Sequence, residues 1–243
     1  MKILKWSARL HKWVALVVGI QILLWLAGGF VMSVIPIEQV RGEHKVRAQA
    51  ARSFDTANLI PLTMAIEAAG FERVANASLA TVLDMPVWSL EATDGRMATV
   101  HAETAEVLSP IDETLARDIA EADYLPEAEI KQITLLSDPP SEFGRPGPVW
   151  QVRFEDRDAT TLYIDPDHAK VLARRSSTWR FYDFFWKLHV MDYDDGADLN
   201  HPLLYTAAGV SVFVALSGLI LLFIKMRRSL LVWRRRRGSK QGA

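Results

Sequence analysis

The sequence predicts an α+β protein in which two transmembrane helices flank an extracytoplasmic domain of two similar helix-plus-antiparallel-sheet repeats. Three observations carry this expectation. Two uncharged apolar runs lie near the two ends of the chain, and basic residues gather outside both runs. The acidic middle of the chain holds two stretches that can be aligned with each other.

The apolar runs are residues 13–35 and 202–224, each 23 residues long without a charged side chain. A helix needs about 20 apolar residues to cross the hydrocarbon core of a bilayer, so each run is long enough to span it. The first run could instead be a signal peptide, whose apolar core is about 7–15 residues long and ends at a small-x-small site. This run is longer and ends in Val34-Ile35-Pro36 without such a site. We therefore expect a retained anchor.

Charge predicts the orientation of these helices. Residues 1–12 contain four Lys or Arg and residues 225–243 contain eight, and neither segment contains an acid. This leaves 16 of the 28 basic residues beside all 29 acidic ones in the rest of the chain. Because Lys and Arg concentrate on the cytoplasmic side of spans, both termini are predicted in the cytoplasm and the middle domain on the far side of the membrane. A basic tail beside a span indicates topology or contact with anionic lipid, so no nucleic-acid partner is expected.

The two alignable stretches are residues 87–108 and 149–172, in which Trp88 and Trp150 are equivalent. Both alternate apolar and polar residues at period two, which indicates half-buried strands, and Asp94-Gly95 is a hairpin signal. Segments 59–69 and 111–122 carry apolar residues at helical spacing. The Pro/Gly-rich segment 138–148 is predicted to be a loop. The sequence therefore predicts two modules, at about residues 55–110 and 111–175.

Several motifs resemble a known family. The segment Tyr163-Ile164-Asp165-Pro166 with Val171-Leu172 resembles the end of a PepSY domain. Others are similar to its membrane-anchored branch, the PepSY-associated transmembrane proteins: Arg9-Leu10-His11-Lys12-Trp13, residues 36–44, residues 179–193 and Asn200-His201-Pro202-Leu203-Leu204. The resemblance covers nearly the whole chain and implies a protein of the bacterial inner membrane whose middle domain lies in the periplasm. PepSY strands usually end in a Thr-Gly-x-Val turn, but Ala105 and Ala169 replace both glycines here. This departure argues against a ligand role for those turns and leaves the expected fold unchanged.

The residue content limits the chemistry. There is no cysteine, which excludes disulfides, thiolate metal sites, a cysteine nucleophile and covalently attached haem. The sequence also lacks a Gly-x-Ser-x-Gly elbow, a His-Glu-x-x-His motif and a Gly-rich phosphate loop. We therefore expect no catalytic activity of the chain on its own.

Three of the six histidines lie at span boundaries: His11, His189 and His201. Imidazole is a usual axial ligand of non-covalent haem. The relatives that the resemblance points to include ferric-siderophore reductases that carry electrons on haem. The resemblance thus implies a subunit with haem b, active in electron transfer for iron uptake or envelope redox chemistry. His11 is predicted at the inner face and the other two at the outer face, so shared ligation requires a homodimer.

Two other interpretations remain open. The histidines can be boundary residues within aromatic belts. The chain is then a membrane-tethered PepSY binding module, without cofactor, that regulates or chaperones another envelope protein. The acidic loop 192–198 has the carboxylate density of a calcium site but lacks EF-hand spacing, and we expect a solvated loop. The predicted order is a cytoplasmic N-terminus (1–12), a first span (13–35), the tandem domain (37–178), an interfacial aromatic segment with the acidic loop (179–200), a second span (202–224) and a basic cytoplasmic tail (225–243).

Overall fold

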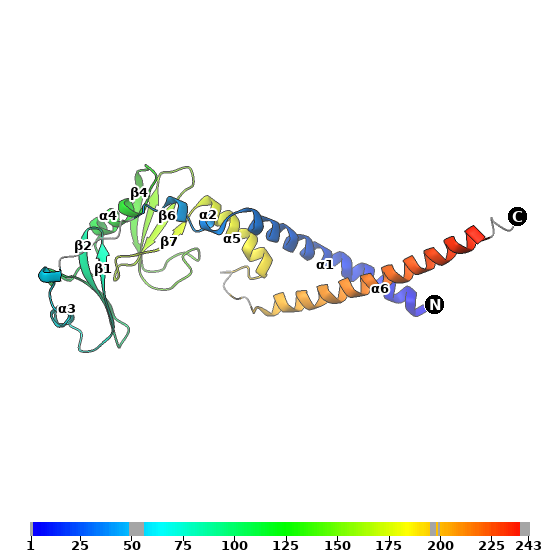
Figure 1. Ribbon diagram of the computed structural model, residues 1–243, viewed down its shortest axis with the longest axis horizontal. Coiled ribbons are helices and arrows are strands. Elements are labelled where there is room, and N and C mark those ends of the chain that lie inside the picture. Colours follow the sequence, from blue (N-terminus) through cyan, green and yellow to red (C-terminus); the bar gives the residue numbers. More distant parts are fainter. Residues whose placement is uncertain (1, 49–55, 195–197, 199, 239–243) are drawn as a thin grey trace. The chain divides into compact units, whose positions relative to one another are not determined.

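A computed structural model of the chain describes residues 2–48, 56–194, 198 and 200–238 (Figure 1). The chain divides into two compact units. One is helical and consists of Met1–Val34 with Asp183–Ala243. The other is Ile35–Tyr182 and contains all the strands of the described residues.

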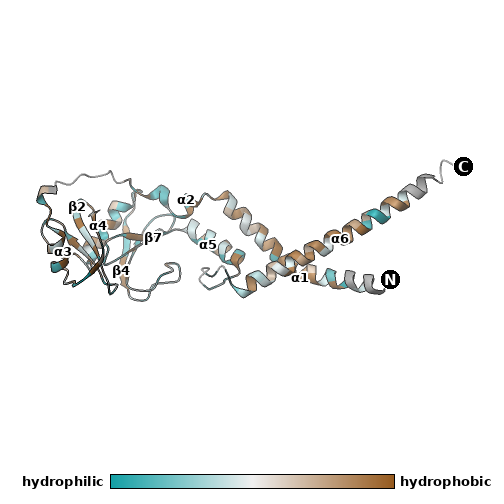
Figure 2. Cartoon of the chain, turned by 60° about the horizontal axis from the view of Figure 1, so that its bottom comes forward, coloured by the Kyte–Doolittle hydropathy of each residue, from teal (hydrophilic) through white to brown (hydrophobic). Residues whose placement is uncertain are grey.

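The helical unit is built on two long helices, α1 (Lys2–Val34) and α6 (Pro202–Gly238). Within them, Arg9–Val34 and Pro202–Trp233 are long and apolar enough to cross a membrane. Hydrophobic residues cover most of both segments (Figure 2). Their large apolar side chains are largely exposed, as on a lipid-facing surface. The most exposed include Val17, Leu23, Phe30, Phe213 and Phe223. The two predicted helices are thus confirmed as candidate membrane spans, and both extend beyond the predicted runs at their basic ends.

The first module of the other unit contains α3 (Leu62–Ala68) and a sheet of β1 (Val74–Val82), β2 (Met85–Ala92) and β3 (Met97–His101), in the order β1-β2-β3. Leu90 and Val100 are fully buried against Ala65 of α3. The helix is shorter than the predicted segment 59–69, because it begins directly after Pro61 and ends before Gly70, which has a φ of +68°. Glycine adopts this left-handed conformation readily and ends helices for that reason.

The second module contains α4 (Glu113–Asp123) and a sheet of β4 (Ile130–Leu136), β5 (Val149–Phe154), β6 (Thr161–Ile164) and β7 (Val171–Arg175), in the order β4-β5-β6-β7. Asp112 caps α4 by accepting a hydrogen bond from Leu115 N at 2.8 Å. The buried face of α4 packs on the sheet, and its Ala116 and Ile119 join Val152 and Leu162 in the largest core cluster. All strand pairs in both modules are antiparallel, which confirms the predicted α+β class.

The two modules repeat each other in detail. Trp88 Nε1 donates to Ile60 O at 3.2 Å and Trp150 Nε1 to Ile111 O at 3.0 Å, so each indole holds the segment that leads into its module's helix. The first strand of each sheet carries a bulge at the same place, between Val74 and Asn76 in β1 and between Ile130 and Gln132 in β4.

Four further helical elements complete the two units. They are α2 (Ile37–Val40), η1 (Glu43–Lys45), η2 (Thr56–Asn58) and α5 (Ser177–Val190). Lys45 joins η1 to the second module through an ion pair with Asp158 at 2.5 Å and a longer one with Asp156 at 3.5 Å. Tyr124, at the end of α4, donates to Asp156 at 2.6 Å. These bonds attach the segment after the first span to the turn between β5 and β6.

The alanines that replace the usual turn glycines lead to a first prediction. Ala105 and Ala169 have φ values of +63° and +53°, a region that costs a residue with a Cβ about 1–2 kcal/mol. We expect Ala105→Gly and Ala169→Gly each to raise the free energy of unfolding by up to about 1 kcal/mol, after the gain in unfolded-state entropy is subtracted. Urea unfolding of the unit Ile35–Tyr182 measures this. Ala77→Gly, at a regularly paired strand position opposite Leu90, is the control and should destabilise. Unchanged or lowered stability in both turn variants would contradict the prediction.

Candidate functional site

His11 lies against α6, with its ring on the surface of Gly218. A Cβ placed on Gly218 would lie 3.4 Å from His11 Cε1 and 3.6 Å from Nε2, so the absence of a side chain makes room for the imidazole. His11 Nδ1 is 2.8 Å from Ser217 Oγ, and Ser217 Oγ donates to Val214 O at 3.0 Å. A serine hydroxyl has one proton, so Nδ1 must be the donor to it. The neutral ring then has a lone pair at Nε2, which has no hydrogen-bond partner among the described side chains.

His189 lies against α1 in a similar way. A Cβ placed on the buried Gly28 would lie 3.5 Å from both Cβ and Nδ1 of His189 and 3.3 Å from Phe185 O. Nδ1 of His189 is buried without a hydrogen-bond partner, and it is the only such side-chain nitrogen or oxygen in the described part of the chain. An unsatisfied buried polar atom costs about 1–3 kcal/mol, so this position requires a particular explanation.

The end of α5 is held by two further side chains of α1. Trp25 Nε1 donates to His189 O at 2.8 Å, and Gln21 Nε2 donates to Leu188 O at 3.4 Å. The last carbonyls of a helix have no partner within the helix and need one from outside, above all in an apolar environment. Gln21, the strongly polar residue of the first span, therefore serves to cap α5.

His201 has a different role. It directly precedes α6, and its Nδ1 accepts a hydrogen bond from Leu203 N at 3.3 Å. When neutral, this ring carries its proton on Nε2, so the arrangement does not offer an Nε2 lone pair. The remaining histidines lie in the other unit, and His168 is bonded to Asp165 at 3.0 Å.

Within one chain the structure does not bring His11 and His189 together. His11 is itself a residue of α1, and His189 contacts Gly28 of the same helix. Residues 11 and 28 are 17 positions apart, which is roughly 25 Å at the helical rise of 1.5 Å per residue. The described residues contain no group of three His, Asp or Glu side chains placed to hold a metal ion. Residues 195–197 of the predicted acidic loop lie outside the described residues.

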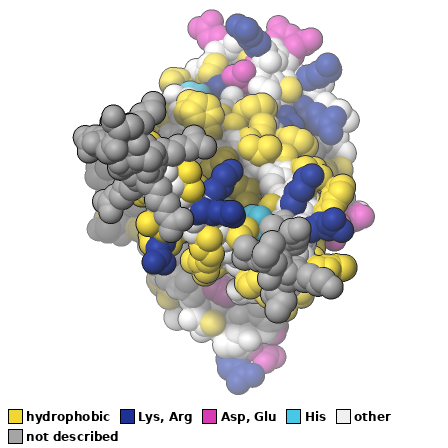
Figure 3. Space-filling model, turned by 90° about the vertical axis from the view of Figure 1, so that its right-hand side faces the viewer, with side chains coloured by type: hydrophobic (Ala, Val, Ile, Leu, Met, Phe, Trp, Pro, Cys, Tyr) yellow, Lys and Arg dark blue, Asp and Glu magenta, His cyan; other side chains and the backbone are white. Residues whose placement is uncertain are grey.

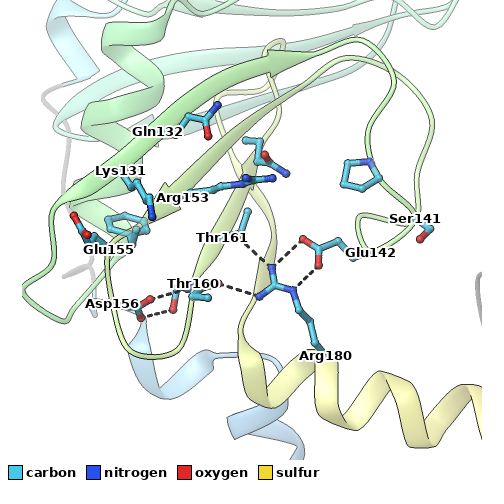
Figure 4. Close-up of a pocket in the computed structure, with 14 residues that line it drawn as sticks. Lys131, Gln132, Ser141, Glu142, Arg153, Glu155, Asp156, Thr160, Thr161 and Arg180 are labelled. Carbon is cyan, nitrogen blue, oxygen red and sulfur yellow. Dashed lines mark hydrogen bonds and ion pairs between the residues drawn. The ribbon is translucent and has the colours of Figure 1, made fainter.

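A second candidate site is an open groove of 710 Å³ in the second module. Its floor is the face of the β4–β7 sheet that is turned away from α4, and its walls are the 140–142 loop, the 155–160 turn and Arg180 of α5 (Figure 4). Charged side chains of both signs line it: Lys131, Arg153, Arg180, Glu142, Glu155 and Asp156.

A hydrogen-bonded network holds the wall of this groove. Gln151 donates to Tyr163 at 2.9 Å, and Tyr163 donates to Glu142 at 2.7 Å. Arg180 donates to both carboxylate oxygens of Glu142, at 2.8 and 3.1 Å. Burial alone would raise the pKa of Glu142, but the hydrogen bonds from Arg180 and Tyr163 outweigh it and lower that pKa below its usual value. Burial and the Glu142 charge raise the pKa of Tyr163. The carboxylate of Glu142 is therefore ionised and fully engaged at neutral pH.

Asp156 at the opposite wall is engaged in the same way. Burial would raise its pKa, but bonds from Thr160 and Tyr124 and the charge of Lys45 lower it instead. The two acids that form the walls thus have their partners within the protein.

The sequence patterns did not reveal the residues that seat the two histidines or those that form the groove. Ser217 and Gly218 are ordinary members of an apolar run, and small residues there indicate helix packing in general. Gln21 was a detectable signal, because a polar residue in a span requires a partner, but the partner is 167 positions away in sequence.

Comparison with known proteins gives a family for the chain. The family described as PepSY-associated TM region matches residues 8–242. No curated protein and no solved structure matches the chain.

Proposed function

The chain belongs to the family of PepSY-associated transmembrane proteins, and on that premise we propose that it is a haem-bearing electron-transfer subunit of the bacterial inner membrane, linked to iron reduction or envelope redox chemistry. The observation that supports this proposal is the seating of two histidines. His11 and His189 each lie on a glycine of a neighbouring helix, and each has a ring nitrogen without a partner among the described residues.

The donor set suits haem b. The two imidazoles lie among apolar helices, where a neutral nitrogen ligand fits better than a carboxylate. Histidines that bind a metal almost always donate their other ring N–H to a fixed acceptor, as His11 does to Ser217. Haem would supply one-electron transfer, and the absence of cysteine requires that it be held without covalent links.

A homodimer would complete the ligation. The single chain offers one histidine at the level of Gly218 and one at the level of Gly28, so a second chain would provide the opposite ligand at each level. A Cβ placed on Gly19, Gly29 or Gly209 would have no atom of the described residues within 4 Å, which leaves surfaces where another helix could approach closely. His201 could join the outer site only if its proton moved to Nδ1 and its bond from Leu203 broke.

Absorption spectroscopy of the full-length protein in detergent tests this proposal. Protein produced with ample haem should show a Soret band and split visible bands on reduction. His11→Ala and His189→Ala should each remove part of the absorbance, because the two sites are separate. His44→Ala, at an exposed position in the other unit, is the matched control and should retain all of it. Absence of any Soret band in the parent protein would exclude the electron-transfer function.

The orientation of the chain is part of the proposal and can be tested alone. Lys and Arg side chains lie among hydrophobic ones in the view from the side of the termini (Figure 3), and residues 1–12 and 225–243 contain only basic charges. We expect a reporter that works only in the cytoplasm to be active when fused after residue 240 and inactive when inserted at Pro140 in the outer loop. A reporter that is active only after periplasmic export, placed at the same two positions, is the control. The reverse pattern would overturn the assigned topology.

A second candidate function is a membrane-tethered binding module without cofactor. The observation that favours it is the groove of the second module, which is open to solvent and lined by charged side chains. The two functions are separable, because the groove and the histidines belong to different units.

A further inference from the structure

A β-bulge forms part of the groove floor. Ile130 and Ile133 of β4 both pack on the core, and the bulge between Ile130 and Gln132 places one extra residue between them. As a result Lys131 and Gln132 both line the groove, where regular alternation would turn one of them to the other face. Arg153 lies on β5 opposite Gln132 and also points into the groove (Figure 4).

The charges of the groove are not balanced. Glu142 and Asp156 are engaged with Arg180 and Lys45, as described above. Among the described residues, Lys131 and Arg153 have neither an ion pair nor a side-chain hydrogen bond, and the remaining lining acid is Glu155 at the rim. Two cations without partners thus face the opening, against one acid.

The first module shows that the fold does not require these cations. Its bulge places Ala75 and Asn76 where the second module has Lys131 and Gln132, and Glu91 pairs with Asn76 as Arg153 pairs with Gln132. A lysine on an edge strand can serve to prevent aggregation. Arg153 lies on an inner strand, so edge protection does not explain it.

The strand beside these cations has an unpaired edge. β4 pairs with β5 alone, and its backbone makes no hydrogen bond to any other described segment. An extended peptide can add to such an edge through its main chain, while its side chains give specificity. The groove is open to solvent and is lined by Lys131 and Gln132 of this strand, which fits a chain segment better than an enclosed small molecule.

We infer that the groove of the second module binds an extended acidic peptide segment of a partner protein, with Lys131 and Arg153 receiving its carboxylates. The inference deepens the binding-module function and is independent of haem. Arg153 provides a planar, two-pronged donor for one carboxylate, and Lys131 provides a point charge for the next. Alternate residues of an added strand point to the same face, so acids at every second position could reach both cations.

Fluorescence anisotropy with the full-length protein in detergent micelles tests this inference. The probe is a labelled acetyl-Val-Glu-Val-Glu-Val-Glu-amide, and its counterpart has Gln in place of Glu. We expect the acidic peptide to bind and the Gln peptide to bind at least about tenfold more weakly, as for the loss of charge-assisted hydrogen bonds. Arg153→Ala and Lys131→Ala should each weaken binding about tenfold as well. Arg73→Ala removes the same charge from an exposed site of the first module, away from the groove, and should change affinity less than about twofold.

Four results would overturn the inference. They are no binding of the acidic peptide, equal binding of both peptides, equal effects of Arg153→Ala and Arg73→Ala, or full displacement of the peptide by an equal concentration of glutarate. The last would assign the groove to small dicarboxylates. If an envelope protein crosslinks equally to the parent and to Arg153→Ala, the chain is a binding module but the groove is not its binding site.

Discussion

Replacing Trp150 by alanine should lower the free energy of unfolding of the unit Ile35–Tyr182 by about 3–5 kcal/mol, the usual range for a large aromatic side chain removed from a core. The indole packs on the main cluster of the second module and donates to Ile111 O, so the variant loses packing and leaves a carbonyl without its donor. Trp88→Ala should have a similar cost in the first module, where the indole packs on the smaller cluster and bonds Ile60 O.

Hydrogen–deuterium exchange of the β2 and β5 amides measures these costs in the full-length chain, because core amides exchange through global opening. Trp150→Phe keeps most of the apolar volume and removes the donor, so it separates packing from hydrogen bonding. The prediction fails if both alanine variants exchange at the rate of the parent.

Arg174→Ala should have an effect of similar size for a different reason. Asp123 at the end of α4 is only 8% exposed, and Arg174 of β7 holds both of its carboxylate oxygens, with a distance of 2.8 Å from Nε to Oδ2. Removal of one partner from a buried pair leaves an uncompensated charge, which costs about 3–5 kcal/mol. We expect the opening free energy that hydrogen–deuterium exchange reports for the α4 and β7 amides to fall by that amount.

Two controls distinguish this mechanism from general damage. Arg117→Ala breaks the exposed pair with Glu113 and should cost less than about 1 kcal/mol. The double variant Asp123→Leu with Arg174→Met removes both charges and should recover much of the stability, because apolar residues of similar size can replace a buried pair. A double variant as unstable as Arg174→Ala would show that the charge is not the cause.

The sequence predicted the features that depend on long or repeated patterns. Two uncharged runs of span length and the equivalence of Trp88 with Trp150 led to the helices and the paired modules. It did not predict β1 and β4. β1 reads Val-Ala-Asn-Ala-Ser-Leu-Ala-Thr-Val, with small and polar residues where strands usually carry large apolar ones, and the bulge in each strand breaks the period of two.

The candidate sites show the same limit. Sequence placed His11, His189 and His201 near the ends of the spans, but the bonding that separates their roles depends on contacts that only the folded chain provides. Ser217 fixes the proton of His11, and the backbone of Leu203 occupies His201. The charge imbalance of the groove could not be predicted from the sequence either. It depends on which acids form ion pairs with Arg180 and Lys45 in the folded chain.

The bond from Gln21 to Leu188 has a consequence for the order of biosynthesis. Translation produces the first helix long before residue 188 exists, so the Gln21 amide enters the bilayer without the carbonyl that it later serves. A polar amide without a hydrogen-bond partner in hydrocarbon is costly. The indole N–H of Trp25 likewise has no acceptor until His189 has been synthesised. The first helix therefore reaches its final environment only after residues 35–182 have been synthesised and α5 has docked on it, which makes this docking a late step in assembly.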